Sequence, residues 1–560
     1  MSVANLVSNG LSVQTLDKVR PRIAFLCLIT FSTVLWIAAV VATRISKLDV
    51  TYFPLLRELP WTFWIGFGLL LVATAQWLVA VTDTERFHFL LLMLWTAYLF
   101  IGPELMEINA RVNDTYDWLL GVTYLEKGRF SVAEGFGYAV FPGYFFISFA
   151  ISKVCGIGYY QLARFLASAL HLFRAVAIFG FASMLYVDRR QILFASLLFT
   201  AMLWMPGTHP SPHGMGFIAL LFVYALAFSE RLIGSPRYVI FALACILAVM
   251  THPVASLMGL LALSLMILVP RFFKRIEDTK LKSLQWRPLL MFWLIFLIWM
   301  IWPADYVFEN IVSYFPRLLP EPLKLPTAPF TQNLTPYRLF VIDFSLAYTI
   351  GVTIWVAWTI LIRTLRPHES RNLPLYPLLG ILPTATVIFI SNNAYSAAQV
   401  AYEYSIPFLI WFLVGDARPS RLAALGLLIA ALVLFPVGHY ANEAVVTFPN
   451  TEVQGARFLV EKTYVRQNVL SLGLRPRLIA LANNPQSDRI DAIAISLPEI
   501  EEFWEKAEFI TNSITTRNFF RYLFGDAAWR WFQERLKGSE KGRIYENGDF
   551  QLYQVRVSAP

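Results

Sequence analysis

The sequence predicts a mainly α-helical membrane protein, with a polytopic bundle of about 12–14 transmembrane helices and a small extracytoplasmic α+β domain at its C-terminus. Hydrophobic residues make up 57% of the 560 residues, and charged residues only 15%. Soluble domains carry about 45–50% apolar and about 25% charged residues, so this excess of apolar side chains needs lipid to bury it. The apolar residues also gather in runs that can span a bilayer, whereas the composition returns to ordinary values after residue 440.

About fourteen apolar runs have roughly the length of a transmembrane helix. No cleavable signal peptide is predicted, because residues 1–22 are too polar and the first apolar run already has full spanning length. The predicted spans are 22–43, 62–81, 86–103, 138–155, 163–187, 191–206, 213–229, 238–251, 253–270, 287–303, 339–362, 374–391, 401–415 and 420–438.

Lysine and arginine in the short loops predict the orientation of the bundle, because cytoplasmic loops carry an excess of these residues. The basic loops are 17–22, 188–190, 230–237, 271–287, 363–371 and 416–421, which places the N-terminus in the cytoplasm. The loops of the other parity then face outward, together with the C-terminal domain; they are 104–137, 208–214, 251–253, 304–338 and 391–399. The alternation does not close between residues 138 and 187, and the number of crossings there stays open.

These patterns divide the chain into a transmembrane bundle, residues 1–439, and a soluble extracytoplasmic domain, residues 440–560. Helical spacing of charged and apolar residues predicts helices in the second part. Its last segment, "GRIYENGDFQLYQVRV", predicts a β-hairpin, because an Asn-Gly turn joins two alternating strands.

Composition also excludes some function classes. The net charge is only +9, and no basic face with interleaved aromatic residues is evident on a polar domain, so the chain is not expected to bind nucleic acid. The three cysteines, Cys27, Cys155 and Cys245, lie in or beside apolar runs at spacings that fit neither a disulfide framework nor a metal knuckle.

Acidic residues follow the third apolar run, in the predicted external loop 104–137. Glu107 comes first, and Asp114 and Asp117 are three residues apart in a segment with helical spacing, so both lie on one helical face. Two interpretations remain open. The carboxylates simply solvate a loop, as most exposed acidic residues do. Alternatively, a carboxylate that is partly desolvated at the membrane surface has a raised pKa and acts as a general base at neutral pH.

The run "DTYDWLLGVTYLEKGRF", followed by "YAVFPGYFF", resembles the first external loop of the GT-C superfamily of polytopic glycosyltransferases, of the protein O-mannosyltransferase or aminoarabinose transferase type and their archaeal relatives. In this resemblance Asp114 corresponds to the catalytic carboxylate and Asp117 to the second acidic position. Tyr138, Phe141 and Pro142 correspond to the start of the next helix. The closing "RIYENGDFQLY" also resembles the tail of such proteins.

The resemblance implies transfer of a sugar from a polyprenyl-phosphate-linked donor to the hydroxyl of a lipid, glycan or protein acceptor at the outer membrane face. The expected mechanism is inversion with one Asp base. Three departures matter: three predicted helices precede the acidic loop instead of one, the signature "WWDYG" is absent, and the soluble domain is short. They argue against en bloc transfer to asparagine and favour transfer of a single sugar or short glycan.

Further polar residues are candidates for substrate binding beside Glu107. Arg317, Arg338 and Tyr314 flank or lie in the external loop 304–338, where arginine suits phosphate; anchoring at the lipid headgroups is the alternative. His209, His213 and His252 are predicted on one face of the membrane. They could contact substrate, bind a metal or cap helix ends. No cofactor is certain, and a divalent cation such as Mg²⁺ or Mn²⁺ stays an open alternative.

Two other function classes compete with the enzyme. A transporter or flippase of a lipid-linked substrate predicts internal repeats and buried charges near the bilayer midplane. No convincing repeat is evident, and the charges are predicted at the ends of the apolar runs. Glu403 is an exception to note, because an ionisable group near a membrane boundary is more often functional. A membrane scaffold with an external receptor domain would explain the C-terminal domain but not the acidic loop.

Overall fold

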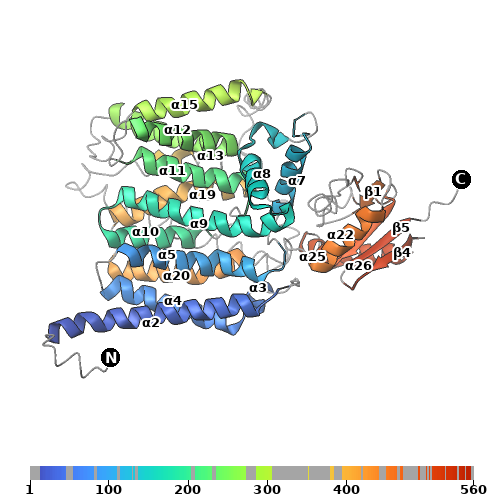
Figure 1. Ribbon diagram of the computed structural model, residues 1–560, viewed down its shortest axis with the longest axis horizontal. Coiled ribbons are helices and arrows are strands. Elements are labelled where there is room, and N and C mark those ends of the chain that lie inside the picture. Colours follow the sequence, from blue (N-terminus) through green and yellow to red (C-terminus); the bar gives the residue numbers. More distant parts are fainter. Residues whose placement is uncertain are drawn as a thin grey trace.

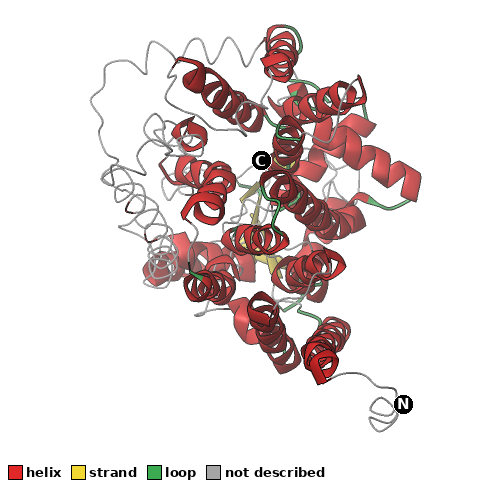
Figure 2. Cartoon of the chain, turned by 90° about the vertical axis from the view of Figure 1, so that its left-hand side faces the viewer, coloured by secondary structure: helices red, strands yellow, loops and turns green. Residues whose placement is uncertain are grey.

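The computed structural model shows a bundle of roughly aligned helices with a small mixed α/β unit at one end (Figure 1). Seen from the side, the bundle helices appear nearly end-on (Figure 2). The structure describes residues 13–45, 54–80, 85–109, 114–128, 130–132, 137–203, 209–229, 235–272, 286–305, 351, 358, 379–383, 394–417, 420–440, 449–462, 467–470, 490–491, 500, 504, 507–523, 525–538, 541–548 and 550–555.

The first three predicted spans form one packed layer of the bundle. Their elements are α2 (Val13–Ala42), the short α3 (Pro54–Glu58), α4 (Trp61–Ala80), and α5 (Glu85–Thr96), which continues through the π-helical turn η1 (Ala97–Ile101) into α6 (Gly102–Met106). A buried hydroxyl network joins them. The Ser32 Oγ donates to the Gly66 carbonyl at 2.9 Å, and the Tyr98 hydroxyl donates to the Ser32 carbonyl at 2.6 Å. A side chain at Gly66 would collide with Tyr98, so glycine permits this contact.

The acidic segment forms the helix that the sequence predicts, α7 (Asp114–Glu126), and the turn η2 (Gly137–Val140) leads into α8 (Gly143–Cys155). Figure 1 shows α7 and α8 running across one end of the bundle. We call this the α7 end. A Cβ added at Gly143 would lie 2.8 Å from the Thr251 side chain and 3.1 Å from the Met250 backbone, so glycine permits the close approach of α8 to α12 (Ser235–Thr251) at this end.

Residues 138–155 do not form the single helix of spanning length that the sequence predicts. Helix α8 has 13 residues, which span about 20 Å, whereas a hydrocarbon core is about 30 Å thick. Pro142 precedes α8, and Gly156 ends it in the left-handed conformation, with φ +65°. The following helix α9 (Tyr159–Leu185) has 27 residues and is long and apolar enough to cross a membrane. One long helix after a short one favours a single crossing in this segment.

The remaining helices alternate along the bundle at nearly the predicted positions. They are α10 (Arg189–Met202), α11 (Pro212–Ala227), α12, α13 (Pro253–Phe272), α15 (Trp286–Ile301), α19 (Ala394–Trp411) with its π-helical continuation η6 (Phe412–Ala417), and α20 (Arg421–Tyr440). The predicted spans 339–362 and 374–391 lie almost entirely outside the described residues.

Five of the described helices are long and apolar enough to cross a membrane, which supports an integral membrane protein. Their outer faces carry exposed apolar side chains that water would not favour, such as Phe31 at 62% and Trp61 at 70% exposure. The five are Arg22–Ala42, Trp61–Val79, Phe87–Met106, Gln161–Leu185 and Arg421–Tyr440.

The C-terminal part forms the predicted α+β unit at the α7 end (Figure 1). Its five-stranded mixed sheet has the order β2-β1-β3-β5-β4. The predicted hairpin is confirmed, since β4 and β5 pair antiparallel and Gly548 in their turn has φ +90°. The elements are α22 (Asn450–Lys462), β1 (Gln467–Leu470), β2 (Ile490–Asp491), β3 (Phe509–Ser513), α25 (Ile514–Leu523), α26 (Gly525–Gly538), β4 (Lys541–Glu546) and β5 (Phe550–Val555). The domain boundary at residue 440 stays a prediction.

Candidate active site

The acidic residues Asp114 and Asp117 stand in the first turn of α7, at the α7 end of the bundle. Their spacing puts them on neighbouring positions of one helix face. The structure describes the helical backbone at both positions but not their side chains.

Helix α7 is held against the bundle by its apolar face. Thr115, Leu119 and Val122 are buried, and the Trp118 ring meets Tyr138 edge-on with centroids 4.8 Å apart. The C-terminal end of α7 is tied as well. Glu126 accepts hydrogen bonds from Lys153 of α8 and from the Tyr159 hydroxyl of α9 at 2.5 Å. The start of α7 is therefore presented on a fixed helix rather than on an isolated loop.

A row of aromatic rings leads from α7 into the bundle. Tyr138 stacks over His252, with centroids 6.5 Å apart and planes 25° from parallel. His252 in turn meets His213 edge-on at 4.9 Å. The prediction that these two histidines lie on one face is confirmed. His209 is half-buried just before α11, where its carbonyl accepts a hydrogen bond from the Ser211 hydroxyl at 3.2 Å.

Glu403 of α19 completes this cluster. Its Oε2 lies 2.5 Å from Nε2 of His213, although 190 residues separate them in the chain. Glu403 is only 2% exposed, and the neighbouring Tyr404 ring meets His213 edge-on at 5.7 Å. The sequence indicates Glu403 as an ionisable group near a membrane boundary but does not connect it to the histidines. We call His213, His252, Glu403 and Tyr138 the histidine cluster.

His252 is neutral at pH 7 and has a defined tautomer. It stands between α12 and α13, where burial and the neighbouring His213 hold its pKa well below the usual value. Its Nδ1 accepts a hydrogen bond from the Ala255 N–H at 3.3 Å, so the ring proton sits on Nε2. Burial also raises the pKa of Tyr138. At neutral pH the neutral His252 ring therefore donates through Nε2–H, and Tyr138 donates through its phenolic O–H.

A second polar cluster lies deeper in the bundle. Glu104 Oε1 is 2.8 Å from His171 Nε2, and His171 Nδ1 is 2.7 Å from Arg174. Because a guanidinium only donates, Nδ1 of His171 accepts and its Nε2–H donates to Glu104. Arg174 also lies 4.3 Å from the Phe100 ring centroid. We call Glu104, His171 and Arg174 the buried triad.

The buried triad lies within electrostatic range of the histidine cluster, because the charges of both Glu403 and Glu104 act on Arg174. Arg174 is 5% exposed and stands near the middle of α9. The prediction that charges gather at the ends of the apolar runs is therefore wrong for this residue. The guanidinium is stabilised there by its hydrogen bond to His171, by the Phe100 ring and by the negative charges of the two glutamates.

Glu107, another predicted binding residue, is not part of this arrangement. Glu107 follows α6 and is 4% exposed, and its backbone pairs with that of Ile45. Arg317, Arg338 and Tyr314 lie outside the described residues. Within the described part of the chain, no three His, Cys, Asp or Glu side chains are placed to hold a metal ion. Binding of a divalent cation therefore stays the open alternative that the sequence predicts.

Close packing at Gly216 sets the distance between α11 and His252, and it leads to a test. An added Cβ at Gly216 would lie 2.6 Å from Cβ of His252. We expect Gly216→Ala to lower the free energy of unfolding by about 1–3 kcal/mol, as overpacking does. Gly180→Ala in α9 is the control, since a Cβ there meets nothing within 4 Å, and it should be neutral or stabilising by up to about 1 kcal/mol. Equal thermal shifts in the two variants would contradict this role of Gly216.

The interactions of Glu126 with Lys153 and Tyr159 predict that the stability of the end of α7 depends on pH. Hydrogen bonds from Lys153 and Tyr159 hold the pKa of Glu126 below its ordinary value of 4.5. A lowered folded-state pKa means that the tie is fully present above pH 4.5 and is lost as the pH falls through the folded value. Because Glu126 is 37% exposed, the effect is below about 1 kcal/mol. The protection of the last-turn amides of α7, measured as the exchange rate relative to the intrinsic rate at the same pH, should fall at acidic pH, and Glu126→Gln should lower this protection and make it independent of pH in this range.

No family model matches the chain, and no curated protein matches it. Solved structures that resemble it include an oligosaccharyltransferase from Archaeoglobus fulgidus in the apo form, with 12% identity, a TM-score of 0.48, and coverage of 86% of this chain and 76% of that one. Another is ArnT from Cupriavidus metallidurans bound to undecaprenyl phosphate, with 11% identity, a TM-score of 0.46, and coverage of 88% and 98%. Because these identities and TM-scores are low, the function of this protein has to be argued from its own residues.

Proposed function

We propose that this protein is a membrane glycosyltransferase that moves a sugar from a polyprenyl-phosphate-linked donor to an acceptor hydroxyl. The observation that carries the proposal is the acidic first turn of α7, on a helix packed against the histidine cluster at one end of the bundle. A polyprenyl chain stays in lipid while its phosphate lies at the membrane boundary. The catalytic side chains therefore have to lie at one end of the bundle, and α7 lies at such an end.

In the proposed reaction, Asp114 is the general base. Its carboxylate takes the proton of the acceptor hydroxyl, the hydroxyl oxygen forms a bond to C1 of the sugar, and the bond from C1 to the phosphate oxygen breaks. The lipid phosphate leaves with the electron pair, and the configuration at C1 inverts. One displacement needs one base and no covalent sugar–enzyme intermediate, unlike a retaining mechanism. Asp117 orients the acceptor, because it occupies the neighbouring position on the same helix.

The histidine cluster supplies hydrogen bonds near the leaving phosphate in this proposal. His252 carries its proton on Nε2, and Tyr138 keeps its phenolic proton, so both can donate to phosphate oxygens. Glu403 fixes the ring of His213. Arg317, Arg338 and Tyr314 remain further candidates for the phosphate, and His209 and Glu107 for the acceptor. The described residues offer no three-ligand set for Mg²⁺ or Mn²⁺, so no step is assigned to a metal.

The sidedness of the site follows from the basic residues of the opposite end. Arg189, Arg190, Arg287 and Arg421 lie at helix starts there. The positive-inside rule puts this end in the cytoplasm. The α7 end and the C-terminal unit would then face outward, and the N-terminus would be cytoplasmic.

A transporter or flippase of a lipid-linked substrate is the second candidate, and the buried triad favours it. Ionisable groups deep in a membrane bundle often mark a transport pathway. In this case Glu104, His171 and Arg174 would bind the substrate during passage, rather than brace the bundle.

Photocrosslinking distinguishes the two candidates. Purified protein in lipid nanodiscs would be labelled with a polyprenyl phosphate that carries a photoreactive group next to the phosphate, and the labelled peptides would be mapped. The glycosyltransferase predicts labels in residues 107–138 and around His213 and His252. Labels concentrated around Arg174, together with protein-dependent flipping of a fluorescent lipid-linked sugar in vesicles, would support the transporter.

A further inference from the structure

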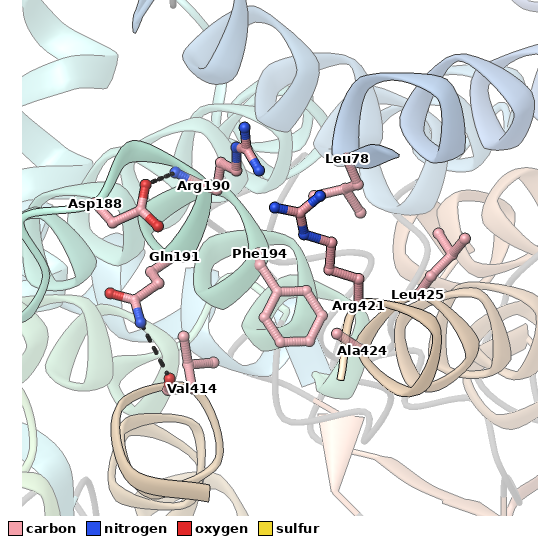
Figure 3. Close-up of a pocket in the computed structure, with 9 residues that line it drawn as sticks. All are labelled: Leu78, Asp188, Arg190, Gln191, Phe194, Val414, Arg421, Ala424 and Leu425. Atoms are coloured by element: carbon pink, nitrogen blue, oxygen red, sulfur yellow. Dashed lines mark hydrogen bonds between the residues drawn. The ribbon is translucent and has the colours of Figure 1, made fainter. Parts of the chain in front are cut away.

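A cavity of about 280 Å³ lies between the ends of four helical elements, away from the proposed active site (Figure 3). Helices α4 and α20, the start of α10 and the π-helical turn η6 surround it. Its lining consists of Leu78, Asp188, Arg190, Gln191, Phe194, Val414, Arg421, Ala424 and Leu425.

The cavity lies at the end of the bundle opposite α7. Tyr159 at the start of α9 is bonded to Glu126 of α7, and Asp188 follows the end of α9. The 27 residues of α9 between these points span about 40 Å. This is about the thickness of a bilayer with its headgroups. The cavity therefore lies at the headgroup level of the other leaflet.

The polar side of the cavity is positively charged. Figure 3 shows the guanidinium groups of Arg190 and Arg421 on the same side, above the Phe194 ring. Within the described residues neither guanidinium is part of a salt bridge. Two like charges at one cavity repel each other unless an anion lies between them.

The carboxylate of Asp188 does not neutralise the pair, because it caps its own helix. Its Oδ1 accepts a hydrogen bond from the backbone N–H of Arg190 at 3.1 Å. Helices α10 and α20, with 14 and 20 residues, both begin at this cavity. The positive ends of their dipoles add to the charge of the two arginines.

The remaining walls are apolar. Leu78 comes from α4, Phe194 from α10, Val414 from η6, and Leu425 from α20. The Gln191 amide donates a hydrogen bond to the Val414 carbonyl at 3.4 Å, so one of its N–H groups is already used. Arg421 is exposed, so the charged side communicates with the surface. A positively charged mouth above apolar walls fits a ligand with a phosphate headgroup and an acyl chain.

We propose that this cavity binds the phosphate of an anionic phospholipid from the leaflet opposite α7. The two guanidinium groups hold the phosphate oxygens through charge-assisted hydrogen bonds, and the glycerol backbone and first acyl carbons lie against Phe194 and Leu425. A soluble phosphate ester offers the same headgroup chemistry without the chain. The proposal is independent of the reaction at the α7 end.

The test measures lipid retention by native mass spectrometry on the full-length protein in detergent. The probes are phosphatidylglycerol, phosphatidylcholine and glycerol phosphate. The wild type should retain phosphatidylglycerol in preference to phosphatidylcholine. The double variant Arg190→Gln, Arg421→Gln should retain it about 25-fold less, since each basic residue near an anionic surface contributes about fivefold. Arg287→Gln is the matched control, because Arg287 is an exposed arginine at the start of α15, outside the cavity.

A second variant separates the cavity from general surface charge. Ala424→Phe keeps both arginines but fills the space between α20 and Phe194, so it should also lower retention of phosphatidylglycerol. Equal retention by the wild type, the double variant and Ala424→Phe would overturn the proposal. Binding of glycerol phosphate as tight as that of phosphatidylglycerol would overturn the lipid assignment and identify a soluble phosphate ester as the ligand.

Discussion

Replacement of Asp114 by asparagine is expected to reduce sugar transfer about 10²–10⁴-fold, essentially to background, without loss of expression or folding. Asparagine has nearly the same shape as aspartate but cannot take a proton from the acceptor hydroxyl. It is also a good residue at a helix start, so α7 should still form. The measurement is the initial rate of transfer from a labelled polyprenyl-phosphate sugar to a hydroxyl acceptor, with thermal unfolding recorded on the same preparations.

Two variants on the same helix serve as controls for Asp114→Asn. Asp117→Asn should weaken transfer less, because this residue is proposed to orient the acceptor. Glu126→Gln lies at the other end of α7 and should change transfer only slightly, since it affects the tie to Lys153 and Tyr159. Full activity of Asp114→Asn would refute the proposed base, and equal losses at Asp114 and Asp117 would leave the choice between them open.

Replacement of Arg174 by methionine is expected to have the largest effect on stability, about 3–5 kcal/mol of unfolding free energy. The reason is that Glu104 and Glu403 are 6% and 2% exposed, and both would lose the cation whose charge they share. Methionine keeps much of the volume, so lost packing contributes little. Thermal and denaturant unfolding in the same detergent would measure the change.

Two further variants separate charge from geometry in the buried triad. Arg174→Lys keeps the positive charge but loses the planar fork, and it should be less destabilising than Arg174→Met. Adding Glu104→Gln to Arg174→Met removes the stranded carboxylate and should restore part of the stability. If the double variant is no more stable than Arg174→Met, then the triad is not held together by charge.

Most of the fold could be predicted from the length of apolar runs. Helices α4, α11 and α20 begin and end within two residues of the predicted spans, because burial in lipid imposes a minimum length on each run. The prediction of one spanning helix over residues 138–155 is wrong. These residues are apolar enough, but Pro142 and Gly156 limit the helix to 13 residues, and hydropathy alone does not register such breaks.

The candidate site could be predicted only in part. His213 and His252 were expected together, since each follows from its position at a helix end on the same side of the membrane. The contact between His213 and Glu403 was not foreseen, because it joins α11 to α19 across 190 residues and depends on how these helices pack. Arg174 was also missed. It is one charge within an otherwise apolar run, and its partners Glu104 and Glu403 come from two other helices.

The most direct test of the proposed function is release of radiolabelled sugar from a synthetic polyprenyl-phosphate sugar, with wild-type protein and Asp114→Asn in parallel. The assay would include several sugars, a hydroxyl acceptor, and divalent cations in separate reactions. The proposal predicts release with the wild type that disappears in Asp114→Asn. Absence of release by the wild type for every sugar, with and without added cations, would contradict it and favour the transporter.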